Sequence, residues 1–194
     1  MSKTTTKKPA QKAAAPKTQP LSVYFMEERH DRTERHTLAV VVDNEPGVLA
    51  RVIGLFSGRG YNIESLTVSE TEHARHISRI TIVTTGTPMI LTQIKHQLER
   101  LVPVHSVTDL TAEGRPLERE LALVKVEASG SARLEAIQLS QAYEASVVHA
   151  TASHFVFQVT GSSPKVDEFI AVMAPLGLAE VCRTGVAAIG RGSK

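Results

Sequence analysis

The sequence predicts an α+β fold of two tandem ferredoxin-like domains, each with the order βαββαβ. Short β-branched runs alternate with stretches whose apolar residues recur at helical spacing. This order occurs twice, and a charged stretch rich in turn formers, residues 111–120, separates the copies. Such a unit packs two helices on one face of an antiparallel sheet. We therefore expect another sheet to cover the second face.

Composition bounds the class of protein. Of the 194 residues, 42% are hydrophobic and 22% are charged, as in soluble globular proteins. A single cysteine, Cys182, excludes an internal disulfide and a cysteine-based zinc site and suits a reducing compartment. No apolar run approaches the ~18 residues of a membrane span. We expect a cytoplasmic protein of the bacterial type, with a plastid as the alternative.

Residues 1–35 are predicted to be a disordered extension. Residues 1–20 carry five lysines and no acid, which leaves a net charge of −3 for residues 21–194 out of the total of +2. A nucleic-acid arm and an organelle transit peptide are alternatives for this segment, but its composition favours a solvated extension. A basic surface across the fold is not indicated, so we expect no nucleic-acid partner.

Residues 36–111 contain the first βαββαβ order. The run T-L-A-V-V-V is typical of a buried strand, and the helix after it ends at Gly58 and Gly60. Pro88 begins the second helix. The predicted strands are 37–42, 63–70, 76–84 and 104–110, and the inward helix positions are Val48, Leu49, Val52, Ile53 and Phe56, then Ile90, Ile94, Leu98 and Leu101.

Residues 118–192 repeat the order. Two runs separated by a polar turn predict a hairpin, and Ser163-Pro164 begins the last helix. The predicted strands are 121–127, 146–152, 153–160 and a final strand over 179–190, and the inward helix positions are Leu134, Ala136, Ile137 and Ser140, then Val166, Phe169, Ile170 and Met173.

The motifs give no positive case for catalysis. The sequence lacks G-x-S-x-G, H-E-x-x-H, G-x-G-x-x-G and G-x-x-x-x-G-K-[ST]. His73 and His76 have a possible metal spacing, but they lie in a polar turn without a strong third ligand nearby. Cys182 lies on a predicted strand, where a structural role is the expected one. We expect no catalytic residue and no metal ligand in this chain.

The stretch D-N-E-P-G-V-L, residues 43–49, offers a site for a small ligand. Gly47 lets a ligand approach the backbone closely, and the first amides of the helix at Val48 have no intrahelical partners. These donors suit a carboxylate, Asn44 adds an amide, and Leu49 and Ile63 can surround an aliphatic side chain. On the residues alone, a plain strand-to-helix turn remains the other interpretation.

The stretch from Asp43 to Leu66, D-N-E-P-G-V-L-A-R-V-I-G-L-F-S-G-R-G-Y-N-I-E-S-L, closely resembles the ACT domain of the regulatory (small) subunit of acetolactate synthase, also called acetohydroxyacid synthase. The resemblance continues through S-R-I-T-I-V-T, Q-L-E-R-L-V-P-V, R-E-L-A-L-V-K-V and C-R-T-G-V-A-A-I-G-R-G, and it covers about residues 36–192. It implies an N-terminal ACT domain, 36–111, and an ACT-like C-terminal domain of the small subunit, 118–192.

The resemblance implies a non-catalytic subunit that binds and activates the catalytic (large) subunit of acetolactate synthase. Thiamine diphosphate, Mg and FAD are expected on that catalytic subunit, and none in this one. The complex serves valine, leucine and isoleucine biosynthesis, and the small subunit makes it sensitive to feedback inhibition, usually by valine. No membrane partner is implied.

In that family, two ACT domains pair in a homodimer and valine lies at their interface. Carried over to this sequence, the turn side of the site is formed by Asn44, Gly47, Val48 and Leu49, and the partner chain contributes Asn62 and Ile63. The turn would bind the carboxylate, and Asn62 would meet the ammonium group or neighbouring backbone. Ala50 departs from the family, which often carries Ser or Thr there.

Two other functions are consistent with parts of the sequence. A stand-alone ACT-type amino-acid sensor, serving another enzyme or a transcription regulator, would bind a ligand without activating a thiamine-dependent enzyme. A nucleic-acid-binding protein that uses the lysine-rich tail would show steeply salt-dependent binding. The absence of basic, aromatic strand faces counts against the second function.

Overall fold

The computed structural model describes residues 32–192, and the predicted extension, apart from its last residues, lies outside them. The N-terminal domain, residues 34–109, follows the predicted order βαββαβ. A single 3-10 turn, η1, joins its second and third strands. The elements are β1 (Glu34–Asp43), α1 (Val48–Ser57), β2 (Ser65–Glu72), η1 (His73–Arg75), β3 (Ile77–Gly86), α2 (Pro88–Glu99) and β4 (Val104–Asp109).

The C-terminal domain, residues 117–189, repeats the order and adds a short last strand. A 3-10 turn, η2, extends the second of its helices. The elements are β5 (Leu117–Glu127), α3 (Gly130–Ala142), β6 (Ser146–Ala150), β7 (His154–Gly161), α4 (Ser163–Met173), η2 (Ala174–Leu176), β8 (Leu178–Arg183) and β9 (Ala187–Ile189).

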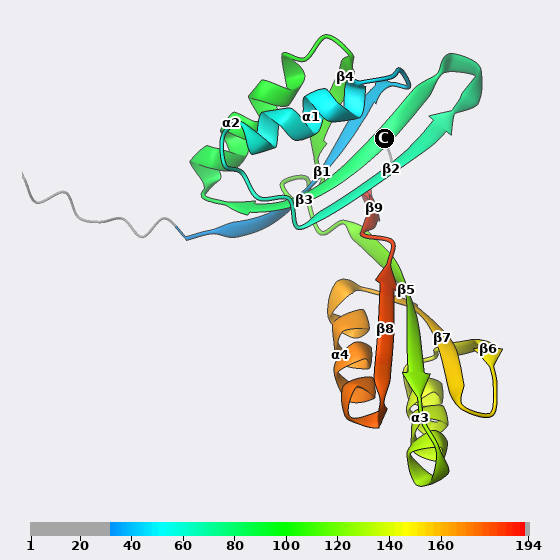
Figure 1. The fold of residues 1–194 in the computed structure, drawn as a ribbon. Helices are drawn as coiled ribbons and strands as arrows, with labels where there is room; N and C mark the ends of the chain where they lie inside the picture. Colours follow the sequence, from blue (N-terminus) through cyan, green and yellow to red (C-terminus); the bar gives the residue numbers. More distant parts are fainter. Residues whose placement is uncertain (1–31, 193–194) are drawn as a thin grey trace, which may run out of the picture. The chain divides into compact units, whose positions relative to one another are not determined.

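The two antiparallel sheets have the same topology. The order is β2-β3-β1-β4 in the first sheet and β6-β7-β5-β8 in the second, so each first strand lies in the middle of its sheet. Figure 1 shows α1 and α2 on one face of the N-terminal sheet. This arrangement confirms the predicted pair of ferredoxin-like domains.

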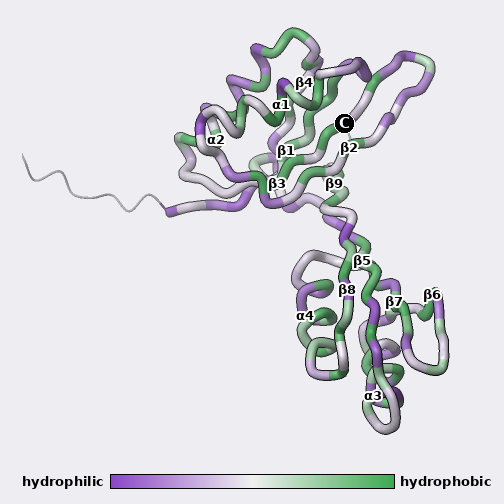
Figure 2. Tube along the Cα trace, in the orientation of Figure 1, coloured by the Kyte–Doolittle hydropathy of each residue, from purple (hydrophilic) through white to green (hydrophobic). Residues whose placement is uncertain are grey.

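Each domain has its own aliphatic core between its helices and its sheet. In the N-terminal core, alternate residues of β1 and β3, such as Leu38, Val40 and Ile82, are fully buried against α1 and α2. The C-terminal core gathers Val124, Phe157 and residues of α4 in the same way. Figure 2 shows hydrophobic residues along the strands of both domains and a largely hydrophilic tip of the β2–β3 hairpin.

Four sequence expectations need correction. Leu49 on α1 and Leu134 on α3, both predicted to face inward, are 37% and 65% exposed, whereas Ala136 and Ser140 are buried as predicted. The predicted strand 179–190 is interrupted between β8 and β9 at Gly185, whose φ of 81° breaks the extended conformation. The extension predicted to reach residue 35 ends earlier, since β1 begins at Glu34.

The second face of the N-terminal sheet is partly covered by the chain itself. Val186 and Ala188, which follow β8, form a buried cluster with Ala39, Val83 and Leu110. Ala39 and Val83 lie on the side of the sheet away from α1 and α2, because they alternate with the core positions of β1 and β3. Part of this face is therefore covered by residues 186–188 of the same chain, and the pairing of the remaining face with another sheet stays a prediction.

Candidate effector site

The turn between β1 and α1 lies at one end of the N-terminal sheet. The amide of Asn44 donates to the carbonyl of His76 at 2.6 Å, which fixes the turn to the start of β3. Gly47 has φ 87°, in the left-handed region that favours glycine, and a Cβ added there would meet nothing within 4 Å. The turn is thus fixed on the strand side and open in front of Gly47.

The first turn of α1 presents free amides at this opening. The amide of Val48 donates to the carbonyl of Glu45 at 3.3 Å. Among the hydrogen bonds of residues 32–192, the amides of Leu49 and Ala50 have no acceptor. Together with the positive end of the helix dipole, these two donors can bind one carboxylate.

The predicted side chains at the turn differ in exposure. Asn44 is exposed and Leu49 is 37% exposed, so both can contact a ligand. Val48 is 5% exposed and belongs to the core, and its amide is already bonded. Val48 therefore positions the turn, and the apolar contact at this end comes from Leu49.

The second predicted segment, Asn62–Ile63, precedes β2. The hydroxyl of Thr84 donates to the carbonyl of Asn62 at 2.6 Å, and the amide of Glu64 donates to the carbonyl of Val83 at 2.8 Å. These bonds fix the backbone and leave the Asn62 side chain exposed. Ile63 is partly buried against the N-terminal core, so it offers only part of its surface.

One chain does not bring the two segments together. The turn lies beside Ile77, which pairs with Asp43, whereas Asn62 is bonded to Thr84 at the other end of β3. Seven residues of strand separate these points, which is roughly 23 Å at ~3.3 Å per residue. A site that contains both segments therefore needs two chains.

Polar residues of the β2–β3 hairpin surround Asn44, and the sequence did not indicate this role. Glu70 accepts a hydrogen bond from the ring of His73 at 3.0 Å. This bond, and to a lesser degree one from the Asn44 side chain, lowers the pKa of Glu70, and the same Glu70 bond raises the pKa of His73. Of the two histidines with a possible metal spacing, His73 thus bonds Glu70 through its ring, and His76 accepts from the Asn44 amide through its backbone carbonyl. In the described part of the chain, no three metal-binding side chains gather.

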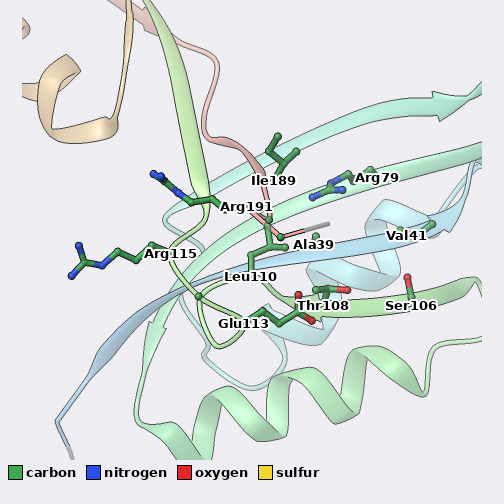
Figure 3. A pocket seen from close by; sticks show the side chains of 13 residues that line it. Ala39, Val41, Arg79, Ser106, Thr108, Leu110, Glu113, Arg115, Ile189 and Arg191 are labelled. Atoms are coloured by element: carbon green, nitrogen blue, oxygen red, sulfur yellow. The ribbon is translucent and has the colours of Figure 1, made fainter. Parts of the chain in front are cut away.

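A cavity of about 370 Å³ lies elsewhere, on the sheet face opposite α1 and α2. Its floor is formed by Ala39, Thr108 and Leu110, and Arg115 and Arg191 at its rim extend away from the sheet (Figure 3). None of the six predicted site residues lines this cavity. The predicted effector site is therefore separate from it and lies at the exposed turn around Gly47.

Within residues 32–192, no helix is long and apolar enough to cross a membrane. The longest, α3, has 13 residues, whereas a membrane-spanning helix needs about 20.

Family comparisons assign both domains. Residues 38–106 match the model of the ACT domain of acetohydroxyacid synthase small subunits, and residues 119–192 match the model of the small subunit of acetolactate synthase. The two matches correspond to the two domains described above to within a few residues.

Whole-chain relatives agree with these matches. The chain is 44% identical over 161 residues to the small subunit of acetolactate synthase isozyme 3 of Escherichia coli, covering 82% of this chain and 98% of that protein. It is 43% identical to the probable acetolactate synthase small subunit of Archaeoglobus fulgidus, over 82% and 99% of the two chains.

A solved structure shares the fold. The crystal structure of the acetolactate synthase small subunit of Thermotoga maritima superposes with a TM-score of 0.75 at 32% identity, over 83% of this chain and 99% of that one. Sequence and structure thus agree along nearly the whole length of these relatives. The chain belongs to the family of acetolactate synthase small subunits.

Proposed function

We propose that this non-catalytic small subunit binds and activates the catalytic subunit of acetolactate synthase and makes it sensitive to feedback inhibition by valine. Membership of the small-subunit family supports a regulatory role for this chain. Activation, the identity of the effector and the homodimer are the steps that we add. Thiamine diphosphate, Mg and FAD belong, in this proposal, to the catalytic subunit.

One observation supports the proposal: the two segments that the sequence assigns to the effector site lie at opposite ends of the same sheet. β2 is an edge strand of that sheet, and its residues 68–72 are exposed. If two copies pair β2 with β2 antiparallel about a two-fold axis, the end carrying Gly47 in one copy lies beside the end carrying Asn62 in the other. The pair of sheets then holds two identical sites, each made by both chains.

The chemistry at each end matches a free branched amino acid. The amides of Leu49 and Ala50 would receive the carboxylate, and the exposed side-chain carbonyl of Asn62 from the other chain would accept from the ammonium group. The exposed part of Leu49 would contact the aliphatic side chain. Valine binding then strengthens or changes the pairing of the two domains, which gives it a means to alter the catalytic subunit.

The test is reconstitution with the purified catalytic subunit. This chain alone should form no acetolactate from pyruvate, should raise the rate of the catalytic subunit when mixed with it, and should make that rate fall when valine is added. An unchanged rate at saturating small subunit would contradict the proposal. Valine binding without any activation would favour the stand-alone sensor.

A further inference from the structure

The segment between β8 and the end of β9, residues 184–189, contacts both domains; we name it the crossing segment. Val186 and Ala188 are 3% and 6% exposed on the second face of the N-terminal sheet. The guanidinium group of Arg79, on β3, donates to the carbonyl of Ala188 at 2.8 Å. β9 at the same time pairs with Leu117–Arg119 of β5. The crossing segment is therefore attached to the sheets of both domains.

The crossing segment touches β2, the strand that follows the Asn62 end of the effector site. The amide of Val186 donates to Oγ of Ser65 at 2.8 Å. A Cβ on Gly185 would lie 2.9 Å from this oxygen, 3.0 Å from Oγ1 of Thr67 and 3.2 Å from the carbonyl of Leu66. Because φ of Gly185 is also 81°, this contact requires glycine.

Its start is fixed to the C-terminal domain. Arg183 binds the carboxylate of Glu120 with two hydrogen bonds, of 2.5 and 2.9 Å, and Asp167 of α4 with a third, of 2.7 Å. Glu120 is 5% exposed, and its bonds raise the pKa of Arg183 above the usual value. Arg183, the residue just before the crossing segment, is thus bonded to both β5 and α4.

A second connection joins the same places. The side chain of Glu64, two residues after Asn62, forms an ion pair with Arg35 at 3.5 Å. Arg35 also binds Glu118 of β5 at 3.1 Å, and Thr37 donates to the same carboxylate. The segment from Asn62 to Ser65 is therefore connected to β5 by two routes, one through the side chain of Arg35 and one through the crossing segment.

Thr67 lies at the contact between β2 and the crossing segment. Its hydroxyl is buried beside Gly185 and has no hydrogen-bond partner among the described residues. Buried hydroxyls nearly always have a partner, so the present arrangement leaves a favourable bond unmade.

We infer that the crossing segment transmits the occupancy of the effector site from β2 to the C-terminal domain. Movement of Asn62 and Ser65 on ligand binding changes the contact of β2 with Gly185 and Val186, and Arg183 passes the change to the C-terminal sheet. This inference rests on the proposed function. It makes Ser65 and Gly185 positioning residues for inhibition, outside the binding site itself.

The experiment separates binding from transmission in the complex of this chain with its catalytic subunit. Ser65→Ala removes the acceptor of the Val186 amide, and Gly185→Ala adds the obstructed Cβ. Gly130→Ala is the matched control, because Gly130 has φ 58° but nothing within 4 Å of an added Cβ. We expect both test variants to keep the valine Kd within about twofold by calorimetry. Residual activity at saturating valine should rise roughly threefold or more, since couplings of this kind are about 5- to 150-fold.

Three results would overturn the inference. The first is full inhibition by valine in both test variants, and the second is a loss of inhibition that parallels a loss of binding. The third is the same change in the Gly130→Ala control. Circular dichroism shows whether Gly185→Ala is folded, and Ser65→Ala, which only removes an oxygen, tests the inference if it is not.

Hydrogen exchange keeps this test separate from that of the proposed function. If the wild-type chain does not bind valine, the proposed function fails, but the connection between the domains can still be measured. Gly185→Ala should then speed exchange of the Glu64 amide, which lies in the other domain. Ser65→Ala should likewise speed exchange of the β9 amides. Changes confined to the mutated side would overturn the inference.

Discussion

Replacing Gly47 with aspartate should abolish most of the valine sensitivity while leaving the fold and much of the activation. The left-handed conformation at φ 87° costs an L-residue ~1–2 kcal/mol, and aspartate tolerates it better than most. A Cβ at this position meets nothing within 4 Å, so no steric cost adds to the strain. The free energy of unfolding should therefore fall by only about 1 kcal/mol.

The effect on binding should be larger, because the new carboxylate lies where the ligand's carboxylate is expected. Losing a hydrogen bond to a charged group costs about 1.5–3 kcal/mol, and repulsion between the two carboxylates adds to this. Since ~1.4 kcal/mol corresponds to a factor of ten, the valine Kd should rise by more than about tenfold. The new carboxylate would also compete with the ligand for the free amides of Leu49 and Ala50 at the helix N-terminus.

Calorimetry on the small subunit and a valine titration of the reconstituted complex measure the two effects. Gly130→Asp is the matched control, because it places the same side chain at φ 58° in open space in the other domain. That control should keep the wild-type valine response. An unchanged Kd in a folded Gly47→Asp variant would refute the assignment of this turn to the ligand carboxylate.

Mixed dimers test whether the site is shared. Asn62→Ala should weaken valine binding from the other end of the sheet. A dimer that pairs a Gly47→Asp chain with an Asn62→Ala chain places both changes in one site and leaves the other site undamaged. Half of the normal binding capacity, at wild-type affinity, is expected. No binding by the mixed dimer would show that the two residues do not form sites across chains.

Three further predictions concern the fold, the hairpin and the N-terminal extension. Gly177→Ala should unfold the C-terminal domain, since φ is 103° and an added Cβ would overlap the carbonyl of Glu127; wild-type thermal stability in this variant would contradict that. The pKa of His73, measured by NMR, should exceed 6.5, and in Glu70→Gln it should return toward 6.5. The stabilisation that charged His73 gives is complete below pH 6.5 and is lost as the pH rises through its raised pKa. The stabilisation that ionised Glu70 gives is complete above pH 4.5 and is lost as the pH falls through its lowered pKa. The hairpin tip should thus be best ordered between these values, as amide exchange can check. Deleting residues 1–31 should leave activation and inhibition nearly unchanged in the reconstituted complex, because their composition cannot bury much apolar surface, and a large loss of either would assign them a role.

Local patterns were enough to predict most elements of the fold. The apolar spacing from Val48 to Phe56 and the position of Pro88 predicted two helices that the structure confirms. Both signals are local, because a helix buries residues at regular short spacing and because proline, which has no backbone N–H, is favoured at the first helical position. The error at Leu134 has the opposite origin. The face of α3 that turns inward depends on the neighbouring helix and sheet, and its apolar pattern is weak.

The sequence by itself also determined the family and the residues of the candidate effector site, because the motif from Asp43 to Leu66 is contiguous and specific. Only the tertiary structure showed that Asn44 and Asn62 lie at opposite ends of one sheet and that Val48 has no group left for a ligand. It alone placed Val186 against Ser65, which is 121 residues away in the chain. Such contacts depend on how strands pair and pack, and strand pairing joins residues whose separation along the sequence carries no local signal.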